Sequence, residues 1–229
     1  MCGRYTLTVI EGFEDFYEID ERVQLEPRYN IAPTQAVPVV VAESPGHRTL
    51  HTMHWGLIPG WSGGPGPNPA RLINARSETV HSRPSFRDAF AFRRCLVPAD
   101  GFYEWRKLGK SRIPIHFSLV DGGLFAFAGL WERWQGAEDP VLHSTSILTT
   151  EPNSLVVDVH DRMPVILTRE RFAAWLDPDT PQTVLQGLMN PLPARQMHCR
   201  TVSKKVNNAR EEGPELLVES PTWQQPGLF

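Results

Sequence analysis

The sequence predicts a single α+β domain, with a mostly antiparallel or mixed, barrel-like β-sheet core and several short helices. Segments rich in β-branched and aromatic residues outnumber helical segments, and the two kinds do not alternate regularly. The 229 residues contain no internal repeat and no clear linker, which favours one domain. We assign this domain to residues 1–208. Residues 209–229 are polar, charged and proline-bearing, and we expect them to form a tail that frays.

Seven segments are predicted to be strands, because Val, Ile, Thr and aromatic residues dominate them and Pro, Gly or Asp bound them. In chain order they are residues 37–41, 49–57, 113–119, 124–131, 142–149, 164–167 and 197–202. The sequence Asp121-Gly122-Gly123 separates two of these segments and predicts a β-hairpin.

Helices are predicted from apolar periodicity and from their start and stop signals. They cover residues 14–18, 85–90, 153–159, 169–176 and 181–188. Asn74 follows apolar residues and is expected to begin a helix as its N-cap. Arg76 is then either a phosphate ligand or a surface charge of that helix. Residues 60–69 are rich in Gly and Pro and predict an exposed loop.

The composition argues against a membrane or secreted protein. No run of about 18 apolar residues predicts a membrane span, and the N-terminus lacks a basic segment followed by an apolar one. Cys2, Cys95 and Cys199 are an odd number of cysteines, which fits a reducing compartment. We therefore expect a cytoplasmic monomer, associated with the nucleoid if it is bacterial. Cys95 and Cys199 are expected to pack as small apolar residues.

Sequence motifs for common cofactors are absent. No His and Cys residues have the spacing of a zinc site, and no Gly-x-x-x-x-Gly-Lys phosphate loop occurs. The glycines at 60–66 precede no clear helix, which argues against a dinucleotide site. No Gly-x-Ser-x-Gly turn predicts a serine hydrolase. We therefore expect neither a metal nor another cofactor.

Positive charge is concentrated in one segment of an acidic chain. The net charge is −3, yet residues 71–94 contain six arginines against two acidic residues, a local excess of four. The planar guanidinium group suits phosphate recognition. This segment is compatible with a phosphate-binding groove, and the alternative is a solvated surface with ordinary ion pairs.

The second residue, Cys2, carries a specific chemistry if Met1 is removed, which its small side chain favours. The α-amine and thiol then form a 1,2-aminothiol. The amine condenses with an aldehyde, and the thiolate closes a five-membered thiazolidine ring. Unperturbed, the two groups titrate at about 7.7–8.0 and about 8.5, near neutral pH. The alternative is that a cysteine beside the start residue has no function.

Two further polar residues are candidates for acid–base chemistry. Glu104 lies between Tyr103 and Trp105, where partial burial would favour its protonated form. The alternative is a surface glutamate between half-buried aromatic residues. His160 lies at the end of an element beside Asp161, and it either holds a tunable proton or makes a structural hydrogen bond.

Seven segments, in this order along the chain, resemble the SRAP (SOS response-associated peptidase) family of abasic-site processing proteins. They are Met1-Cys-Gly-Arg-Tyr5, Tyr29-Asn-Ile-Ala-Pro-Thr34, Trp55-Gly-Leu-Ile-Pro59, Asn74-Ala-Arg-Ser-Glu-Thr79, Arg94-Cys-Leu-Val-Pro-Ala-Asp-Gly-Phe-Tyr-Glu-Trp105, His160-Asp-Arg-Met-Pro164 and Val206-Asn-Asn208. One such segment is weak evidence, whereas seven in order are strongly specific. The resemblance extends from Cys2 to about Asn208 and implies an SRAP-like fold.

The resemblance implies a protein that crosslinks itself to abasic sites in single-stranded DNA. The crosslink is a thiazolidine at the N-terminal cysteine, which shields the site from strand cleavage and error-prone bypass during the DNA damage response. It also implies lyase-type Schiff-base chemistry and an autopeptidase activity that removes the initiator methionine. By their positions in the family's motifs, the implied catalytic residues are Cys2, Asn74, Glu104 and His160.

Several residues are expected to contact DNA. Arg4 and Arg76 match DNA-contacting arginines of the family. We further expect Arg162 to bind a phosphate, and Trp55, Trp61 or Phe102 to stack on bases.

Two other functions stay open. One is an N-terminal-nucleophile hydrolase or cysteine peptidase, in which the amine of Cys2 serves as the base for its own thiol. The other is a single-stranded DNA-binding module without catalysis, in which Cys2 is structural.

Overall fold

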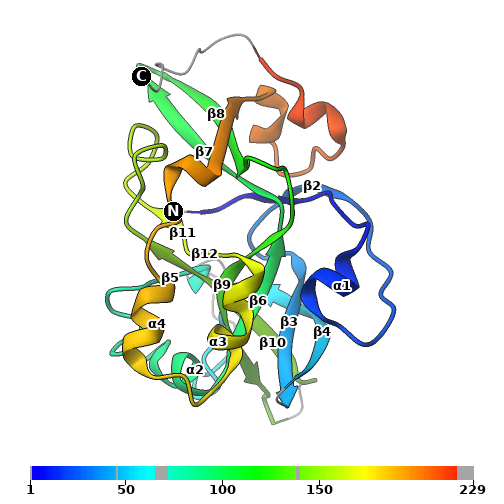
Figure 1. The fold of residues 1–229 in the computed structure, drawn as a ribbon, viewed down its shortest axis with the longest axis vertical. Coiled ribbons are helices and arrows are strands. Elements are labelled where there is room, and N and C mark those ends of the chain that lie inside the picture. The colour runs from blue at the N-terminus through cyan, green and yellow to red at the C-terminus, as the bar shows by residue number, and fades with distance from the viewer. Residues whose placement is uncertain (1, 45, 65–71, 138–139, 221–229) are drawn as a thin grey trace.

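The structure is a computed structural model and describes residues 2–44, 46–64, 72–137 and 140–220 (Figure 1). Its strands form two sheets that share one apolar core. The first sheet has the order β13-β8-β7-β1-β2. Its members are β1 (Tyr5–Leu7), β2 (Arg28–Ile31), β7 (Gly101–Leu108), β8 (Ser111–Leu119) and β13 (Met197–Thr201).

The second sheet has the order β11-β10-β4-β3-β6-β9-β12, and β5 pairs with β10. Its members are β3 (Ala36–Ser44), β4 (His47–Trp55), β5 (Asn74–Arg76), β6 (Arg94–Ala99), β9 (Phe125–Trp134), β10 (Leu142–Thr150), β11 (Met163–Pro164) and β12 (Ile166–Leu167). Since β10 also pairs with β9, the strands β10, β4, β3, β6 and β9 are joined into a ring. Ring closure leaves these five strands without a free edge.

Short helices cover the outside of the strands. They are α1 (Phe13–Tyr17), α2 (Arg87–Phe92), α3 (Phe172–Leu176) and α4 (Gln182–Leu188), with 3₁₀ helices η2 (Arg169–Arg171), η3 (Ala194–Gln196), η4 (Lys204–Asn207) and η5 (Pro214–Leu217). Within the described residues, none of the helices is both long and apolar enough to cross a membrane. The predicted α+β class in one domain is confirmed.

Three local predictions are wrong. Residues 153–159 form hydrogen-bonded turns and not the predicted helix. The side chain of Asn153 accepts hydrogen bonds from the backbone N–H groups of Leu155 and Val156, both at 3.0 Å, and these bonds stabilise a turn. The turn at 121–123 does not close a hairpin, since β8 pairs with β7 and β13 while β9 pairs with β6. Asn74 begins strand β5 and is not a helix N-cap.

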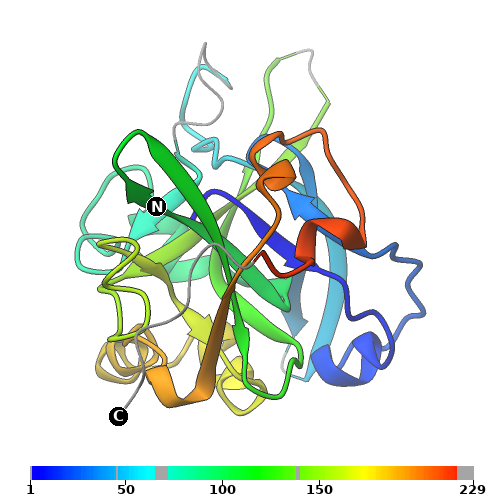
Figure 2. The same ribbon diagram turned by 90° about the horizontal axis from the view of Figure 1, so that it is seen from above.

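The C-terminal segment continues the fold beyond residue 208. The side-chain amide of Asn30 donates to the carbonyls of Asn208 at 3.0 Å and Glu211 at 2.8 Å. Leu216 is fully buried. Figure 2 shows this orange and red segment lying over the green and blue strands of the first sheet. The expected fraying is therefore wrong for residues 209–220, and residues 221–229 lie outside the described part.

A buried aspartate marks the place where β6 of the ring continues into β7 of the first sheet. Asp100 accepts the hydroxyl of Thr6 at 2.6 Å, the hydroxyl of Thr8 at 2.6 Å and the backbone N–H of Val9 at 2.8 Å. These bonds satisfy a carboxylate that would otherwise be costly to bury. They also fix the N-terminal strand β1 against β7.

The next residue, Gly101, leaves no room for a side chain. An added Cβ atom would lie 2.2 Å from Nε2 of His116 and 2.9 Å from the carbonyl oxygen of Phe117. His116 is itself buried, and burial lowers its pKa to about 3, so its ring stays neutral. Strands β7 and β8 of the first sheet therefore pack around a glycine and a neutral histidine at this point.

Gly101→Ala is expected to lower the free energy of unfolding by about 3 kcal/mol, because the methyl group would force β7 and β8 apart. Urea unfolding followed by circular dichroism measures the change. The matched control is Gly187→Ala in helix α4, where nothing lies within 4 Å of the added atom. That change should leave stability equal or raise it by up to about 1 kcal/mol. Equal stability of Gly101→Ala and wild type would contradict the packing described.

Candidate functional site

The pairing of β1 with β7 brings the start of the chain beside Glu104. Tyr5 is opposite Phe102, and the backbone N–H of Tyr103 donates to the carbonyl of Arg4 at 2.9 Å. In an antiparallel pair, each step towards the N-terminus from Arg4 corresponds to one step further along β7. Cys2 therefore extends alongside the part of β7 that contains Glu104.

Cys2 is fully buried. Burial raises the pKa of its thiol well above the usual range, and the nearby charge of Glu104 raises it further. The expectation that this thiol titrates near neutral pH is therefore wrong for the folded protein. The thiol of Cys2 rests in its protonated form and needs a partner that accepts its proton when it reacts.

Asn74 is hydrogen-bonded to Cys2. Its Nδ2 atom donates to the backbone carbonyl of Cys2 at 3.0 Å and to that of Ile73 at 2.7 Å. The Oδ1 atom is buried without a hydrogen-bond partner among the described residues. A buried acceptor of this kind costs stability unless a ligand or water satisfies it. Asn74 thus presents an open acceptor beside the first residues of the chain.

Glu104 is buried, with 3% of its surface exposed. Burial raises its pKa to about 8, and the negative charge of Asp161 contributes to the shift. Glu104 is therefore mostly protonated at neutral pH and has a proton to donate. This burial excludes the alternative of a surface glutamate.

His160 is half-buried, and two contacts of its Nδ1 atom make opposite demands. Nδ1 accepts the backbone N–H of Arg162 at 3.0 Å, which requires it to lack a proton, and it lies 2.9 Å from Oδ1 of Asp161, which would favour a proton. Burial lowers the pKa of His160, whereas Asp161 acts in the opposite direction. Because the side chain of Asp161 is 88% exposed and screened by water, we take the ring as neutral with its proton on Nε2.

Strand β10 brings the segment of His160 close to that of Asn74. Thr149 on β10 pairs with Arg76 of β5 on one side and with Pro164 of β11 on the other. The two segments therefore flank the same end of one strand, and Figure 1 shows β5 and β11 at that end. The structure thus brings together the regions of all four predicted catalytic residues.

Two of the arginines expected to contact DNA already have protein partners. Arg162 forms a two-pronged ion pair with Glu78 and donates to the carbonyl of Thr149 at 2.7 Å. A phosphate would have to displace a carboxylate there. Arg4 donates through Nη1 to Asn30 at 2.7 Å and to the carbonyl of Val206 at 2.8 Å. Both residues thereby hold the site together.

Arg76 is exposed and lines a hollow of about 520 Å³. Asn74, Arg83, Phe86 and Trp61 line the same hollow, so it joins a predicted catalytic residue to two guanidinium groups and an exposed indole ring. An open, positively charged hollow with an aromatic rim is suited to a nucleic-acid strand.

The arginine-rich segment 71–94 is only partly available to a phosphate. Among its described residues, several are engaged elsewhere: Arg87 with Asp88, Arg93 with Glu132, and Arg94 with the carbonyls of Phe90, Ala91, Trp175 and Asp177. Arg71 lies outside the described residues. The alternative of ordinary ion pairs therefore applies to part of this segment, and Arg76 and Arg83 line the hollow.

Trp55 cannot stack on a base in this structure. Its ring is fully buried, packs against Tyr5 at 5.3 Å between ring centroids, and donates its indole N–H to the carbonyl of Ile73. Phe102 is buried as well. Trp61, in contrast, is 68% exposed, so it is the expected stacking residue that has an accessible ring.

Two residues of the site had no role assigned from the sequence. Asn30 holds Arg4, and Glu78 holds Arg162. Both lie inside segments that carried the family resemblance, which was the available signal. Their partners are 26 and 84 residues away in the chain, so no local pattern indicates these contacts.

The comparison with known families agrees with the resemblance that the seven segments carry. A family model described as SOS response associated peptidase (SRAP) matches residues 1–209. The chain belongs to the SRAP family.

Relatives of this SRAP chain match it over nearly its whole length. YoqW of Bacillus subtilis, named an abasic site processing protein, is 41% identical over 228 residues, covering 95% of this chain and 99% of that protein. YedK of Escherichia coli, with the same description, is 29% identical and covers 95% of this chain and 99% of its own length. A crystal structure of a protein from Bacteroides thetaiotaomicron has a TM-score of 0.85 at 24% identity, covering 96% of this chain and all of its own. That likeness shows the shared fold.

Proposed function

We propose that this SRAP protein captures abasic sites in single-stranded DNA by forming a covalent thiazolidine with Cys2, after Met1 has been removed. The observation that carries the proposal is the hydrogen bond from Asn74 to the carbonyl of Cys2, close to Glu104, whose burial raises its pKa to about 8. The names of the relatives YoqW and YedK support it. Removal of Met1 by the protein itself is part of the proposal, and Met1 lies outside the described residues.

The capture joins an aldehyde and an aminothiol and releases one water. The α-amine of Cys2 adds to the aldehyde carbon of the opened sugar and gives a carbinolamine. Glu104 donates its proton to the departing hydroxyl group, so that water leaves and an iminium ion forms, with one hydrogen still on its nitrogen. The sulfur then adds to the iminium carbon as the thiol proton returns to Glu104, and the nitrogen keeps its hydrogen, which gives a neutral thiazolidine. A carboxyl group with a pKa near 8 suits both transfers.

Asn74 positions the reacting groups, and His160 assists the opening of the sugar ring. The open Oδ1 acceptor of Asn74 is suited to the α-amine or to a sugar hydroxyl, which aligns the amine, thiol and aldehyde carbon. Holding reacting groups in this way is worth several kcal/mol of activation free energy. His160 carries its proton on Nε2 in our assignment and is suited to donating to the ring oxygen of the closed sugar.

The thiazolidine protects the DNA strand. Its nitrogen no longer forms the iminium group that promotes β-elimination, so the strand next to the abasic sugar stays intact. We propose that Arg76 and Arg83 bind the phosphates of this strand and that Trp61 stacks on a neighbouring base.

A denaturing gel separates this proposal from its alternatives. Mature protein is mixed with single-stranded DNA that carries one abasic site, with intact DNA as the control. A shifted band with abasic DNA supports covalent capture. Binding of the DNA without a covalent band would favour the binding module. Cleavage of an unrelated peptide without DNA capture would favour the hydrolase.

Arg76→Ala is expected to weaken binding of single-stranded DNA and to reduce the slope of log affinity against log salt by about 0.7, the loss of one phosphate contact. Fluorescence anisotropy over a salt series measures both. Arg87→Ala removes the same charge from a residue paired with Asp88 and serves as the control. Equal losses in the two variants would argue that the hollow beside Asn74 is not the binding face.

A further inference from the structure

The loop of residues 58–64, which carries Trp61, is fastened to strands β9 and β10 by three hydrogen bonds. The bonds run from the backbone N–H of Ile58 to Oγ of Ser144 at 2.9 Å, from that of Gly60 to Oε2 of Glu132 at 3.3 Å, and from the indole N–H of Trp134 to the carbonyl of Ser62 at 2.9 Å. The last two anchors flank Trp61 on both sides in the chain. Trp61 is thus exposed while its neighbours are held.

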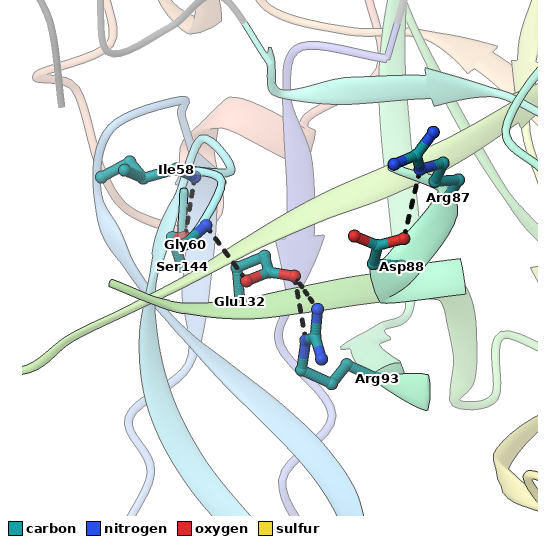
Figure 3. A network of polar contacts seen from close by, with 7 residues as sticks. All are labelled: Ile58, Gly60, Arg87, Asp88, Arg93, Glu132 and Ser144. Carbon is teal, nitrogen blue, oxygen red and sulfur yellow. Dashed lines mark hydrogen bonds and ion pairs between the residues drawn. The ribbon is translucent and has the colours of Figure 1, made fainter. Parts of the chain in front are cut away.

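Glu132 is itself fixed from the opposite direction. Its Oε1 atom accepts Nε of Arg93 at 2.9 Å and also a second nitrogen of the same guanidinium group. Figure 3 shows the Glu132 side chain between Gly60 and Arg93, and shows Asp88 in a separate pair with Arg87. The side chain of Glu132 is only 10% exposed, so water screens these interactions weakly.

Trp61 stands between two hollows. On one side lies the hollow of about 520 Å³ beside Asn74 and Arg76, and on the other a smaller one of about 180 Å³ that Glu132 and Asp88 line. An indole ring in this place can contact a base next to a sugar that reaches Asn74.

We propose that Glu132 and Trp134 are positioning residues that hold Trp61 at the rim of the DNA-binding hollow, where it stacks on a base beside the abasic nucleotide. This inference rests on the proposed function. The loop contains Gly60, Gly63 and Gly64 around Trp61, so without anchors it would lose much conformational entropy on binding. With the anchors, this loss of conformational entropy occurs when the protein folds and not when it binds DNA. The loop is therefore preorganised for binding.

The backbone at Gly64 fits the same purpose. Its φ of +116° favours glycine, and a Cβ atom there would lie 3.2 Å from the Trp134 ring. Trp134 therefore packs closely under the far end of the loop as well as bonding to Ser62. Two contacts from one side chain set the path of the chain after Trp61.

The test uses single-stranded DNA with a tetrahydrofuran analogue of the abasic site, which lacks the aldehyde and binds without reacting. Glu132→Ala is expected to weaken its binding about 3-fold or more, because Trp61 loses its support. Electrostatics alone predicts the opposite, since the change removes a negative charge near DNA. Asp88→Ala removes the same charge beside the same small hollow, and should leave affinity equal or raise it. Glu132→Gln keeps an acceptor for Gly60 and should recover most of the affinity.

A second variant leaves the charge unchanged. Trp134→Phe keeps a ring against Gly64 but removes the N–H that bonds Ser62, and should weaken binding about 2-fold or more. Gln135→Ala, at the exposed residue directly after the end of β9, is its control. Thermal unfolding of each variant shows that the fold persists.

Trp61→Ala provides the decisive background. In that background, Glu132→Ala and Trp134→Phe should cause no further weakening of DNA binding, because their effect passes through the indole ring.

With true abasic DNA at saturation, the maximal crosslinking rate of both variants should match wild type, so that only the affinity changes. Wild-type affinity of both variants, or undiminished effects in the Trp61→Ala background, would overturn the proposal. A wild-type protein that binds the analogue but never crosslinks would overturn the proposed capture and leave this inference standing.

Discussion

Replacing Cys2 with alanine is expected to abolish the crosslink that survives a denaturing gel, with a yield at least about 100-fold below wild type. The variant keeps a free α-amine after loss of Met1 and can still form an imine with the abasic aldehyde. It lacks the thiol that closes the ring, so the imine hydrolyses or eliminates. The measurement is the fraction of abasic DNA in the shifted band at a fixed time.

Two controls show that chemistry, and not folding, is lost in Cys2→Ala. Borohydride reduces the trapped imine and should restore a covalent band, and without it the variant should cleave more strand than wild type. A second protein with one retained extra residue ahead of Cys2 keeps the thiol but turns the amine of Cys2 into an amide, and it should give no band without borohydride. A stable band from the extended protein would show that the α-amine is not used.

Glu104→Gln is the second change with a large expected effect. Removing a group that both donates and accepts a proton should slow crosslinking at saturating DNA by about 100-fold. The amide is close in shape to the carboxyl group and adds no charge to the buried site, so DNA affinity should hold. The rate of band formation at several DNA concentrations separates rate from affinity.

The crosslinking rate and the stability of the protein are both expected to depend on pH through Glu104. Burial raises the pKa of Glu104 to about 8, so its acidic form, and the wild-type rate of dehydration, should decline as pH rises through about 8. Because the raised pKa belongs to the folded state, wild-type stability is full below the ordinary pKa of a glutamate and falls as pH rises towards 8. Glu104→Gln should therefore unfold at a higher temperature than wild type above pH 8 and at a similar one near pH 4. A pH-independent difference would contradict the assignment.

Local sequence patterns predicted part of the strand framework. All seven predicted strand segments contain strand in the structure, because the β-branched and aromatic residues that dominate them pack well in a sheet. Strands β6 and β7 were not predicted, since the run from Arg94 to Trp105 contains Pro98, Asp100 and Gly101, which normally indicate a turn. Asp100 is tolerated there because Thr6, Thr8 and Val9, from the start of the chain, satisfy its carboxylate.

In the candidate site, too, local sequence indicated some features, whereas others depend on distant residues. Cys2, Glu104 and His160 were selected as candidates from their chemistry, and the carboxyl group of Glu104 was expected to be partly desolvated between Tyr103 and Trp105. The structure confirms that it is buried. The contacts of Arg162 and Trp55 could not be predicted, because each depends on a distant partner. Arg162 is paired with Glu78, and Trp55 is buried in the ring of strands. A residue type gives its capacity for contact, whereas tertiary packing decides which contact it makes.

The hydrogen bond from Arg4 to the carbonyl of Val206 spans 202 positions in the chain. During synthesis, the segment that carries Cys2 leaves the ribosome early, and the carbonyl that holds Arg4 in place leaves it late. A partly made chain would therefore carry its reactive thiol before the surroundings of that thiol exist. Contacts of such sequence separation form slowly and only as the whole domain assembles. Under the proposed function, the reactive residue is therefore synthesised first, and the contacts that position it for an abasic site are complete only in the finished domain.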